Sequence, residues 1–139
     1  MVYNWLVLTL TIDRELPEAV YEQIARQVRR LVASGQLAAG TKLPSVRQLA
    51  RDLGVNLNTI ARAYRLLDSE GFLLIRERAG VEVAPPAARI ARPTRAVLVQ
   101  ELREVLARMR QAGMEPELLH GIVAREIEAL GDRPGRSER

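Results

Sequence analysis

Hydrophobic positions recur with a helical period between residues 44 and 67. Two runs carry apolar side chains at every third or fourth position, with polar or basic side chains between them. Such spacing places the apolar residues of each run on one face of an α-helix. We therefore predict two short amphipathic helices, with buried positions Val46, Leu49, Ala50 and Leu53 in the first and Ile60, Ala63, Tyr64 and Leu67 in the second.

The residues that flank these runs predict where each helix begins and ends. Pro44 and Ser45 favour the start of the first helix, because proline needs no N–H partner in a first turn and serine caps the free N–H groups. Gly54 suits the left-handed residue that often ends a helix, and Asn56 can cap the next one. Two helices joined by so short a turn form a helix-turn-helix, a frame that reads DNA.

The outward positions of the second helix carry the chemistry that recognises base pairs in the major groove. Asparagine pairs with adenine, arginine pairs with guanine, and the methyl groups of leucine or threonine contact the thymine methyl group. The candidates are Asn56, Leu57, Asn58, Thr59 and Arg62. The alternative is a solvated polar face on an ordinary helix. The tight turn and the basic helix before it favour DNA reading.

A β-hairpin is expected after the two helices. Residues 72–76 are rich in β-forming side chains, residues 77–80 can turn, and residues 81–83 alternate. A hairpin in this place makes the domain a winged helix. Gly80 is expected at the tip, where a missing Cβ permits close approach to a partner, and Arg78 adds positive charge there. A solvated turn would use the same residue types.

Two further elements are predicted before the helix pair. Leu6, Leu8, Leu10 and Ile12 alternate with other side chains, which favours a strand that joins the wing sheet or pairs across a dimer. This segment is too short to span a bilayer and lacks the flanks of a signal peptide. A helix is expected from Pro17 to about residue 34, with Tyr21, Ile24, Val28 and Leu31 as its buried stripe.

The C-terminal part of the chain predicts a linker followed by two helices. Residues 85–93 are rich in proline and alanine, Thr94 can cap a helix that stops at Gly113, and a second helix begins at residues 115–116. A hairpin of about 35 residues cannot bury two wide apolar faces by itself. A second copy of the chain would cover them in a C2 dimer, and packing against the winged helix of a monomer is the alternative. The expected dimerisation residues are Leu98, Leu102, Val105, Leu106, Met109, Leu119, Ile122, Val123 and Ile127.

The predicted organisation is mainly α-helical with a small β-hairpin wing. It consists of a winged helix-turn-helix domain over residues 1–84, a linker over residues 85–93, a two-helix dimerisation region over residues 94–131, and a disordered tail over residues 132–139. A chain of 139 residues has room for one such domain and a small appendage.

Charge and composition favour a polyanionic partner and disfavour catalysis. The net charge is +4, and residues 44–65 hold four arginines against one aspartate, whereas residues 97–130 hold four arginines against six glutamates. The positive charge is therefore local to the predicted reading head. The absence of cysteine excludes disulfides and thiolate metal sites and fits the cytoplasm. His120 is the only histidine, so we expect no metal, no cofactor and no enzyme activity.

Several segments together resemble the winged-helix domain of the GntR family of bacterial transcription regulators. The resemblance extends without a gap over about residues 10 to 84 and rests on residues 17–24, 35–37, 40–50, 54–56, 58–59 and 63–64. It implies that Arg47, Asn56, Asn58, Thr59 and the wing glycine Gly80 bind DNA. Relatives often carry arginine or proline where Leu57 stands, and many carry arginine where Ala61 stands, so the preferred bases cannot be copied from a relative.

The short two-helix appendage is similar to that of the YtrA-like branch of this family, where it serves dimerisation. The resemblance therefore implies a homodimeric regulator, expected to be a repressor, that binds an inverted-repeat operator in double-stranded DNA. Lys42, Ser45, Arg47, Arg62 and Arg78 complete the expected DNA contacts. Two other classes remain open, an architectural DNA-binding protein with little sequence preference and a winged-helix protein-interaction module. No effector pocket can be recognised in the sequence.

Overall fold

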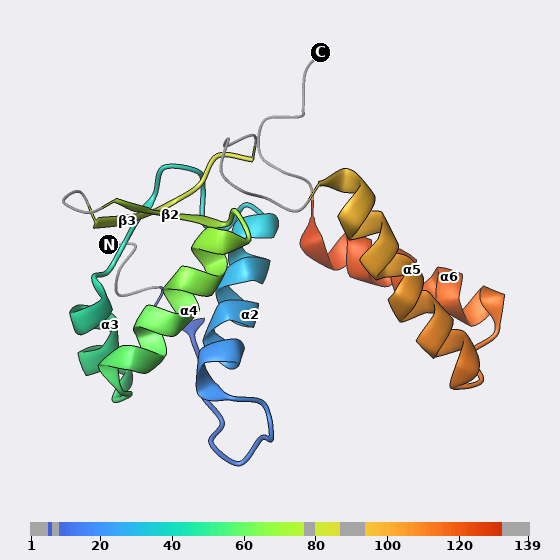
Figure 1. Cartoon of the computed structure of the whole chain (residues 1–139), viewed down its shortest axis with the longest axis horizontal. Coiled ribbons are helices and arrows are strands. Elements are labelled where there is room, and N and C mark those ends of the chain that lie inside the picture. The colour runs from blue at the N-terminus through green and yellow to red at the C-terminus, as the bar shows by residue number, and fades with distance from the viewer. Residues whose placement is uncertain (1–5, 7–8, 77–79, 87–93, 132–139) are drawn as a thin grey trace. The chain divides into compact units, whose positions relative to one another are not determined.

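The structure is a computed structural model that describes residues 6, 9–76, 80–86 and 94–131. The chain divides into two compact units, Met1–Ala91 and Arg92–Arg139 (Figure 1). The predicted fold class, mainly helical with a small sheet, is confirmed. In chain order the elements are α2 (Val20–Ala33), β1 (Lys42–Leu43), α3 (Val46–Leu53), α4 (Leu57–Ser69), β2 (Leu73–Arg76), β3 (Gly80–Val83), α5 (Arg95–Gln111) and α6 (Pro116–Leu130).

The first unit packs α2 and α3 against α4, with the sheet beside the end of α4 (Figure 1). Most positions of the apolar stripes predicted from the sequence form its core, whereas Tyr21, Val46 and Leu53, which were predicted to be buried, are half-buried and pack against it. Burial of these side chains is the main term that stabilises the unit. The fully buried members include Ile24, Val28, Leu49, Ile60, Ala63 and Leu67.

The wing is a three-stranded antiparallel sheet with strand order β1-β3-β2. The predicted hairpin is confirmed, with Leu73 opposite Val83 and Arg76 opposite Gly80. Gly80 lies at the first position of β3 and not at the tip of the turn, and its φ is 85°. The strand β1, which pairs with β3, was not predicted, because two residues are too few to show an alternating pattern.

The predicted N-terminal strand is wrong for the described residues. Leu6 and Thr9 have helical backbone, and the Leu10 N–H donates to the Leu6 carbonyl at 3.0 Å. Leucines at positions 6 and 10 satisfy a helical period as well as an alternating one, so the pattern was ambiguous. Both are buried in the core. The Gln27 side chain, from α2, holds the Thr11 backbone by accepting from its N–H at 2.9 Å and donating to its carbonyl at 2.6 Å.

The helix α2 begins at Val20, three residues later than predicted. The buried side chain of Gln23 explains the difference. Its Nε2 donates to the carbonyl oxygens of Asp13 at 2.8 Å and Glu18 at 2.9 Å, and its Oε1 accepts from the Asp13 N–H at 2.9 Å. These bonds satisfy the buried amide and hold residues 13–18 in a turn against α2.

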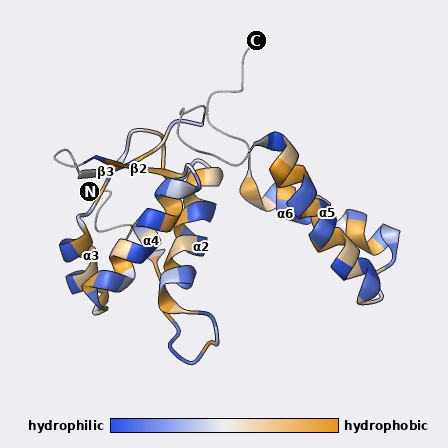
Figure 2. Cartoon of the chain, in the orientation of Figure 1, coloured by the Kyte–Doolittle hydropathy of each residue, from blue (hydrophilic) through white to orange (hydrophobic). Residues whose placement is uncertain are grey.

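The second unit consists of α5 and α6. The predicted starts of both helices are confirmed, since Thr94 caps α5 by accepting from the Val97 N–H at 3.3 Å, and Pro116 opens α6. Hydrophobic residues lie along both helices (Figure 2). No residue of α5 is buried, and Leu119 is the one buried residue of α6. Over the residues that the structure describes, no helix is long and apolar enough to cross a membrane.

Candidate nucleic-acid interface

The turn between α3 and α4 is held by several backbone bonds. Gly54 is left-handed, with φ 66° and ψ 38°, as the sequence predicted. The N–H groups of Gly54 and Val55 donate to the carbonyls of Arg51 at 3.3 Å and Ala50 at 3.0 Å, which closes α3. The Arg14 guanidinium, from the segment before α2, donates to the Gly54 carbonyl at 3.0 Å. The sequence carried no signal for this last contact, because 40 residues separate the partners.

The side chains predicted to cap the two helices do so. Ser45 Oγ accepts from the Gln48 N–H at 3.1 Å, and Asn56 Oδ1 accepts from the Asn58 N–H at 2.8 Å. The Asn56 oxygen is thus engaged in the cap, which leaves its amide N–H groups to donate. Both caps set the positions of the first turns of α3 and α4.

The buried side chain of Tyr64 links the two helices. Its hydroxyl donates to the Pro44 carbonyl at 2.8 Å, and burial raises the pKa of this hydroxyl well above its ordinary value. The bond joins the middle of α4 to the residue before the cap of α3. The angle between the helices is therefore supported at the turn and at the opposite end of α3.

The first two turns of α4 present the predicted base-reading residues to solvent. Leu57, Asn58 and Arg62 are exposed, and Thr59 is half-buried. Leu57 has 44% of its surface exposed although it is apolar, and the capping Asn56 beside it is also exposed. The structure thus brings donors, acceptors and a methyl-bearing side chain together at the start of one helix.

Four arginines of α3 and α4 are exposed and form no ion pair with a carboxylate within the described part of the chain: Arg47, Arg51, Arg62 and Arg65. Two of the three arginines of α2 behave differently, since Arg26 pairs with Glu18 at 3.1 Å and Arg29 pairs with Glu70 at 2.7 Å, whereas Arg30 is exposed. Residues 44–65 hold four arginines against one aspartate, so the helix-turn-helix has a local excess of positive charge, as expected for a face that meets phosphates.

The wing contributes less free charge than the sequence suggested. Arg76 Nε lies 2.8 Å from Glu82 Oε1, across the β2–β3 pair, so the charge of Arg76 is balanced. Arg78 lies outside the described residues. Gly80 and Lys42 are both exposed, on β3 and β1. The structure therefore brings Lys42 and Gly80 into the same sheet.

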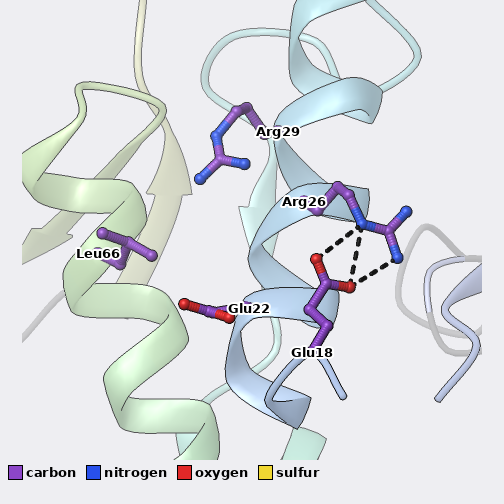
Figure 3. Close-up of a pocket in the computed structure, with 5 residues that line it drawn as sticks. All are labelled: Glu18, Glu22, Arg26, Arg29 and Leu66. Atoms are coloured by element: carbon purple, nitrogen blue, oxygen red, sulfur yellow. Dashed lines mark hydrogen bonds and ion pairs between the residues drawn. The ribbon is translucent and has the colours of Figure 1, made fainter. Parts of the chain in front are cut away.

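A pocket lies between α2 and α4 (Figure 3). Its lining includes the Glu18–Arg26 pair, and the side chains of Glu22 and Leu66 point into the space between the helices. Arg29 completes the lining and is paired with Glu70. Two acidic and two basic side chains balance one another here, so the pocket has no net preference for an anion.

Metal chemistry has no candidate in the described residues, where no group of three or more histidine, cysteine, aspartate or glutamate side chains could hold an ion. The face that remains distinctive is the basic, polar surface of α3 and α4. Sequence reasoning found most of it. It placed Tyr21 in the buried stripe of α2 and missed its contact with Arg62, whose guanidinium Cζ lies 4.0 Å from the centroid of the Tyr21 ring.

Comparison with known proteins agrees with this geometry. The family model of bacterial regulatory proteins of the gntR family matches residues 20–83. The HTH-type transcriptional repressor YtrA of Bacillus subtilis (strain 168) is 32% identical over 112 residues, which cover 80% of this chain and 86% of YtrA. Two further curated relatives are several times longer, and the chain spans 22% and 17% of their lengths.

Two solved structures resemble the chain over most of its length. YtrA from Sulfolobus acidocaldarius, a GntR-family transcription factor, is 33% identical, with a TM-score of 0.55 and coverage of 85% of this chain and 96% of that one. A transcriptional antiterminator from Listeria monocytogenes EGD-e is 26% identical, with a TM-score of 0.75 and coverage of 88% and 93%. We conclude that the chain is a helix-turn-helix transcription regulator of the GntR family of bacterial regulatory proteins.

Proposed function

We propose that the protein is a repressor that binds an inverted-repeat operator as a homodimer. Two copies of α4 would enter successive major grooves about 34 Å apart. The observation that carries the proposal is the set of exposed, carboxylate-free arginines around the polar start of α4. Such a face supplies both the sequence-independent attraction of phosphates and the donors that recognise bases.

Each proposed contact follows from the chemistry of its side chain. Arginine and lysine donate to phosphates or to guanine, and the amides and hydroxyl at the start of α4 meet base edges. The wing would approach the neighbouring backbone. The residues assigned to DNA are Lys42, Ser45, Arg47, Asn56, Leu57, Asn58, Thr59, Arg62, Arg78 and Gly80.

The homodimer is proposed from the second unit. Leu98, Leu102 and Ile127 have 52%, 49% and 64% of their surfaces exposed. A helix pair with almost no buried residue gains stability when a second copy covers its apolar faces. The interface is assigned to Leu98, Leu102, Val105, Leu106, Met109, Leu119, Ile122, Val123 and Ile127.

Repression is the direction that the relatives support, since YtrA of Bacillus subtilis is a transcriptional repressor. A dimer seated on a promoter would exclude RNA polymerase from the same DNA. This activity needs neither a cofactor nor a metal, and it takes place in the cytoplasm, where a bacterial chromosome lies.

Selection from a randomised duplex DNA pool with the purified full chain tests the proposal. We expect an inverted repeat with fixed half-site spacing, and binding of the selected DNA that weakens steeply with salt. A preference below about a thousandfold over random DNA would indicate an architectural protein instead. Absence of salt-dependent binding would indicate a protein-interaction module. A reporter gene placed behind the selected DNA then distinguishes repression from activation.

A further inference from the structure

The side chain of Tyr21, near the start of α2, supports Arg62 of the reading helix. The guanidinium of Arg62 lies over the ring, with Cζ 4.0 Å from the centroid. The Tyr21 hydroxyl donates to Oε1 of the neighbouring, exposed Glu22 at 3.1 Å. Tyr21 is half-buried and packs against the core, whereas Arg62 is exposed. An aromatic ring that packs against the core thus lies beneath an exposed guanidinium.

A second arginine in the same unit also lies over a ring but differs in its charge balance. Arg29 is 5.7 Å from the centroid of Phe72, and it is also paired with Glu70 at 2.7 Å. Arg62 has the closer ring and no carboxylate partner among the described residues. The Tyr21 ring is therefore the contact that holds the Arg62 side chain.

Stacking holds an arginine without using its hydrogen-bond donors. The ring attracts the flat face of the guanidinium. The five N–H groups lie in the plane of the guanidinium and point outward from its edges, away from the ring. Those donors stay available to a phosphate or to the paired acceptors of guanine. An arginine without such a contact loses side-chain conformational entropy when it binds DNA. A stacked arginine has lost part of this entropy before binding, so its binding costs less free energy.

We propose that Tyr21 is a positioning residue, which holds Arg62 in the orientation from which it contacts operator DNA. This inference rests on the proposed function. It assigns part of the DNA affinity to α2, a helix that carries none of the DNA contacts proposed above. Tyr21 acts through Arg62 and not through a DNA contact of its own.

The test measures the affinity of full-length variants for the selected operator at several salt concentrations. Tyr21→Leu removes the ring, and we expect about 3- to 10-fold weaker binding. The salt dependence should be unchanged, because the number of phosphate contacts is the same. Arg62→Ala should weaken binding further and lower the salt slope by about one if its partner is a phosphate. Tyr21→Leu should have no additional effect in the Arg62→Ala background.

Three further variants separate the ring from other roles. Tyr21→Phe keeps the ring and should bind within about twofold of the unchanged protein. Arg62→Lys leaves Tyr21 and the core untouched and keeps the charge but loses the flat face, so it should bind several-fold more weakly with the original salt slope. Phe72→Leu is the matched control, since it removes the ring beneath the carboxylate-paired Arg29, and should leave operator binding unchanged. Thermal melting of each variant reports whether its fold is intact.

Several results would overturn the inference. Equal weakening by Tyr21→Leu in the presence and absence of the Arg62 side chain would show that Tyr21 acts independently of Arg62. A Tyr21→Phe variant as weak as Tyr21→Leu would assign the effect to the hydroxyl. Unchanged operator binding by Arg62→Ala would show that Arg62 does not contact the operator. The positioning role of Tyr21 would then be wrong, whereas the proposed function would still stand. Absence of any operator for the unchanged protein would instead contradict the proposed function itself.

Discussion

The hydroxyl of Tyr64 donates to the carbonyl oxygen of Pro44 at 2.8 Å inside the core. This bond joins residues that are 20 positions apart, one in the middle of α4 and one just before α3. A buried carbonyl that lost this donor would remain unsatisfied. The orientation of α4 relative to α3 therefore depends on a polar bond as well as on apolar packing.

Replacement of Tyr64 by phenylalanine should lower the free energy of unfolding at neutral pH by about 1 to 2 kcal/mol, because the Pro44 carbonyl loses its partner while ring packing is kept. Urea unfolding measures the change. A variant as stable as the unchanged protein would show that water or a shifted backbone satisfies the carbonyl.

Ionisation of Tyr64 should lower the stability of the protein at alkaline pH. Burial raises the pKa of Tyr64 in the folded state, so ionisation above about pH 10 occurs first in the unfolded chain. The stability that Tyr64 contributes is fully present below about pH 10. As the pH rises above this value, the free energy of unfolding should fall by up to about 1.4 kcal/mol for each pH unit. Unfolding curves between about pH 9 and pH 11 check this, with Tyr64→Phe as the control that lacks the titrating group. Parallel declines in the two proteins would assign the effect to other groups.

Arg47→Ala should weaken operator binding by about 1 to 3 kcal/mol, because Arg47 is exposed on α3 without a carboxylate partner among the described residues. Titration of labelled operator by fluorescence anisotropy measures it. Arg30→Ala is the matched control, since Arg30 is an exposed arginine on α2 and its loss changes the net charge equally. Equal weakening by the two variants would show that the net charge of the protein, and not a contact of Arg47, determines the effect.

We expect Leu57 to recognise one operator position through the methyl group of a thymine. Its exposed side chain at the first position of α4 can contact the thymine C5-methyl group. Replacing that thymine by uracil removes only the methyl group and should weaken binding about fourfold, from about 0.8 kcal/mol of lost apolar burial. Operators with single uracil substitutions, titrated with the unchanged protein and with Leu57→Ala, measure the effect. Uracil should have no effect on the variant, and indifference of the unchanged protein at every position would exclude methyl reading.

Removal of the chain after Pro93 should make the protein monomeric and weaken binding to an inverted repeat far more than binding to a single half-site. Full-length protein with both Leu98→Gln and Leu102→Gln should behave in the same way, because both side chains belong to the exposed apolar face of α5. Analytical ultracentrifugation and half-site titrations measure the two effects.

The matched control for this interface is Ala107→Gln. Ala107 is exposed on α5 and lies about two and a half turns from Leu98, on the opposite side of the helix. The Ala107→Gln variant should therefore remain dimeric. Undiminished inverted-repeat binding by the truncated chain would show that the winged-helix unit dimerises without α5 and α6.

Much of the first unit could be predicted from local patterns. The stripes of α3 and α4, the caps at Ser45 and Asn56 and the left-handed Gly54 each depend on residues within a few positions of one another. The N-terminal segment could not be assigned, because leucines at positions 6 and 10 fit both a strand and a helical turn. The start of α2 was misplaced, because it depends on the Gln23 side chain and not on the local preference of Pro17.

The sequence by itself determined which side chains of α3 and α4 are exposed and where these two helices begin and end, since helical period, capping and turn formation are short-range properties. Only the tertiary structure decided which arginines keep their charge free. Arg76 is neutralised by a cross-strand glutamate, and Arg62 is held by the ring of Tyr21, from a helix 41 positions earlier in the chain. Such contacts arise when packing brings distant segments within a few ångströms, and no local pattern encodes that distance.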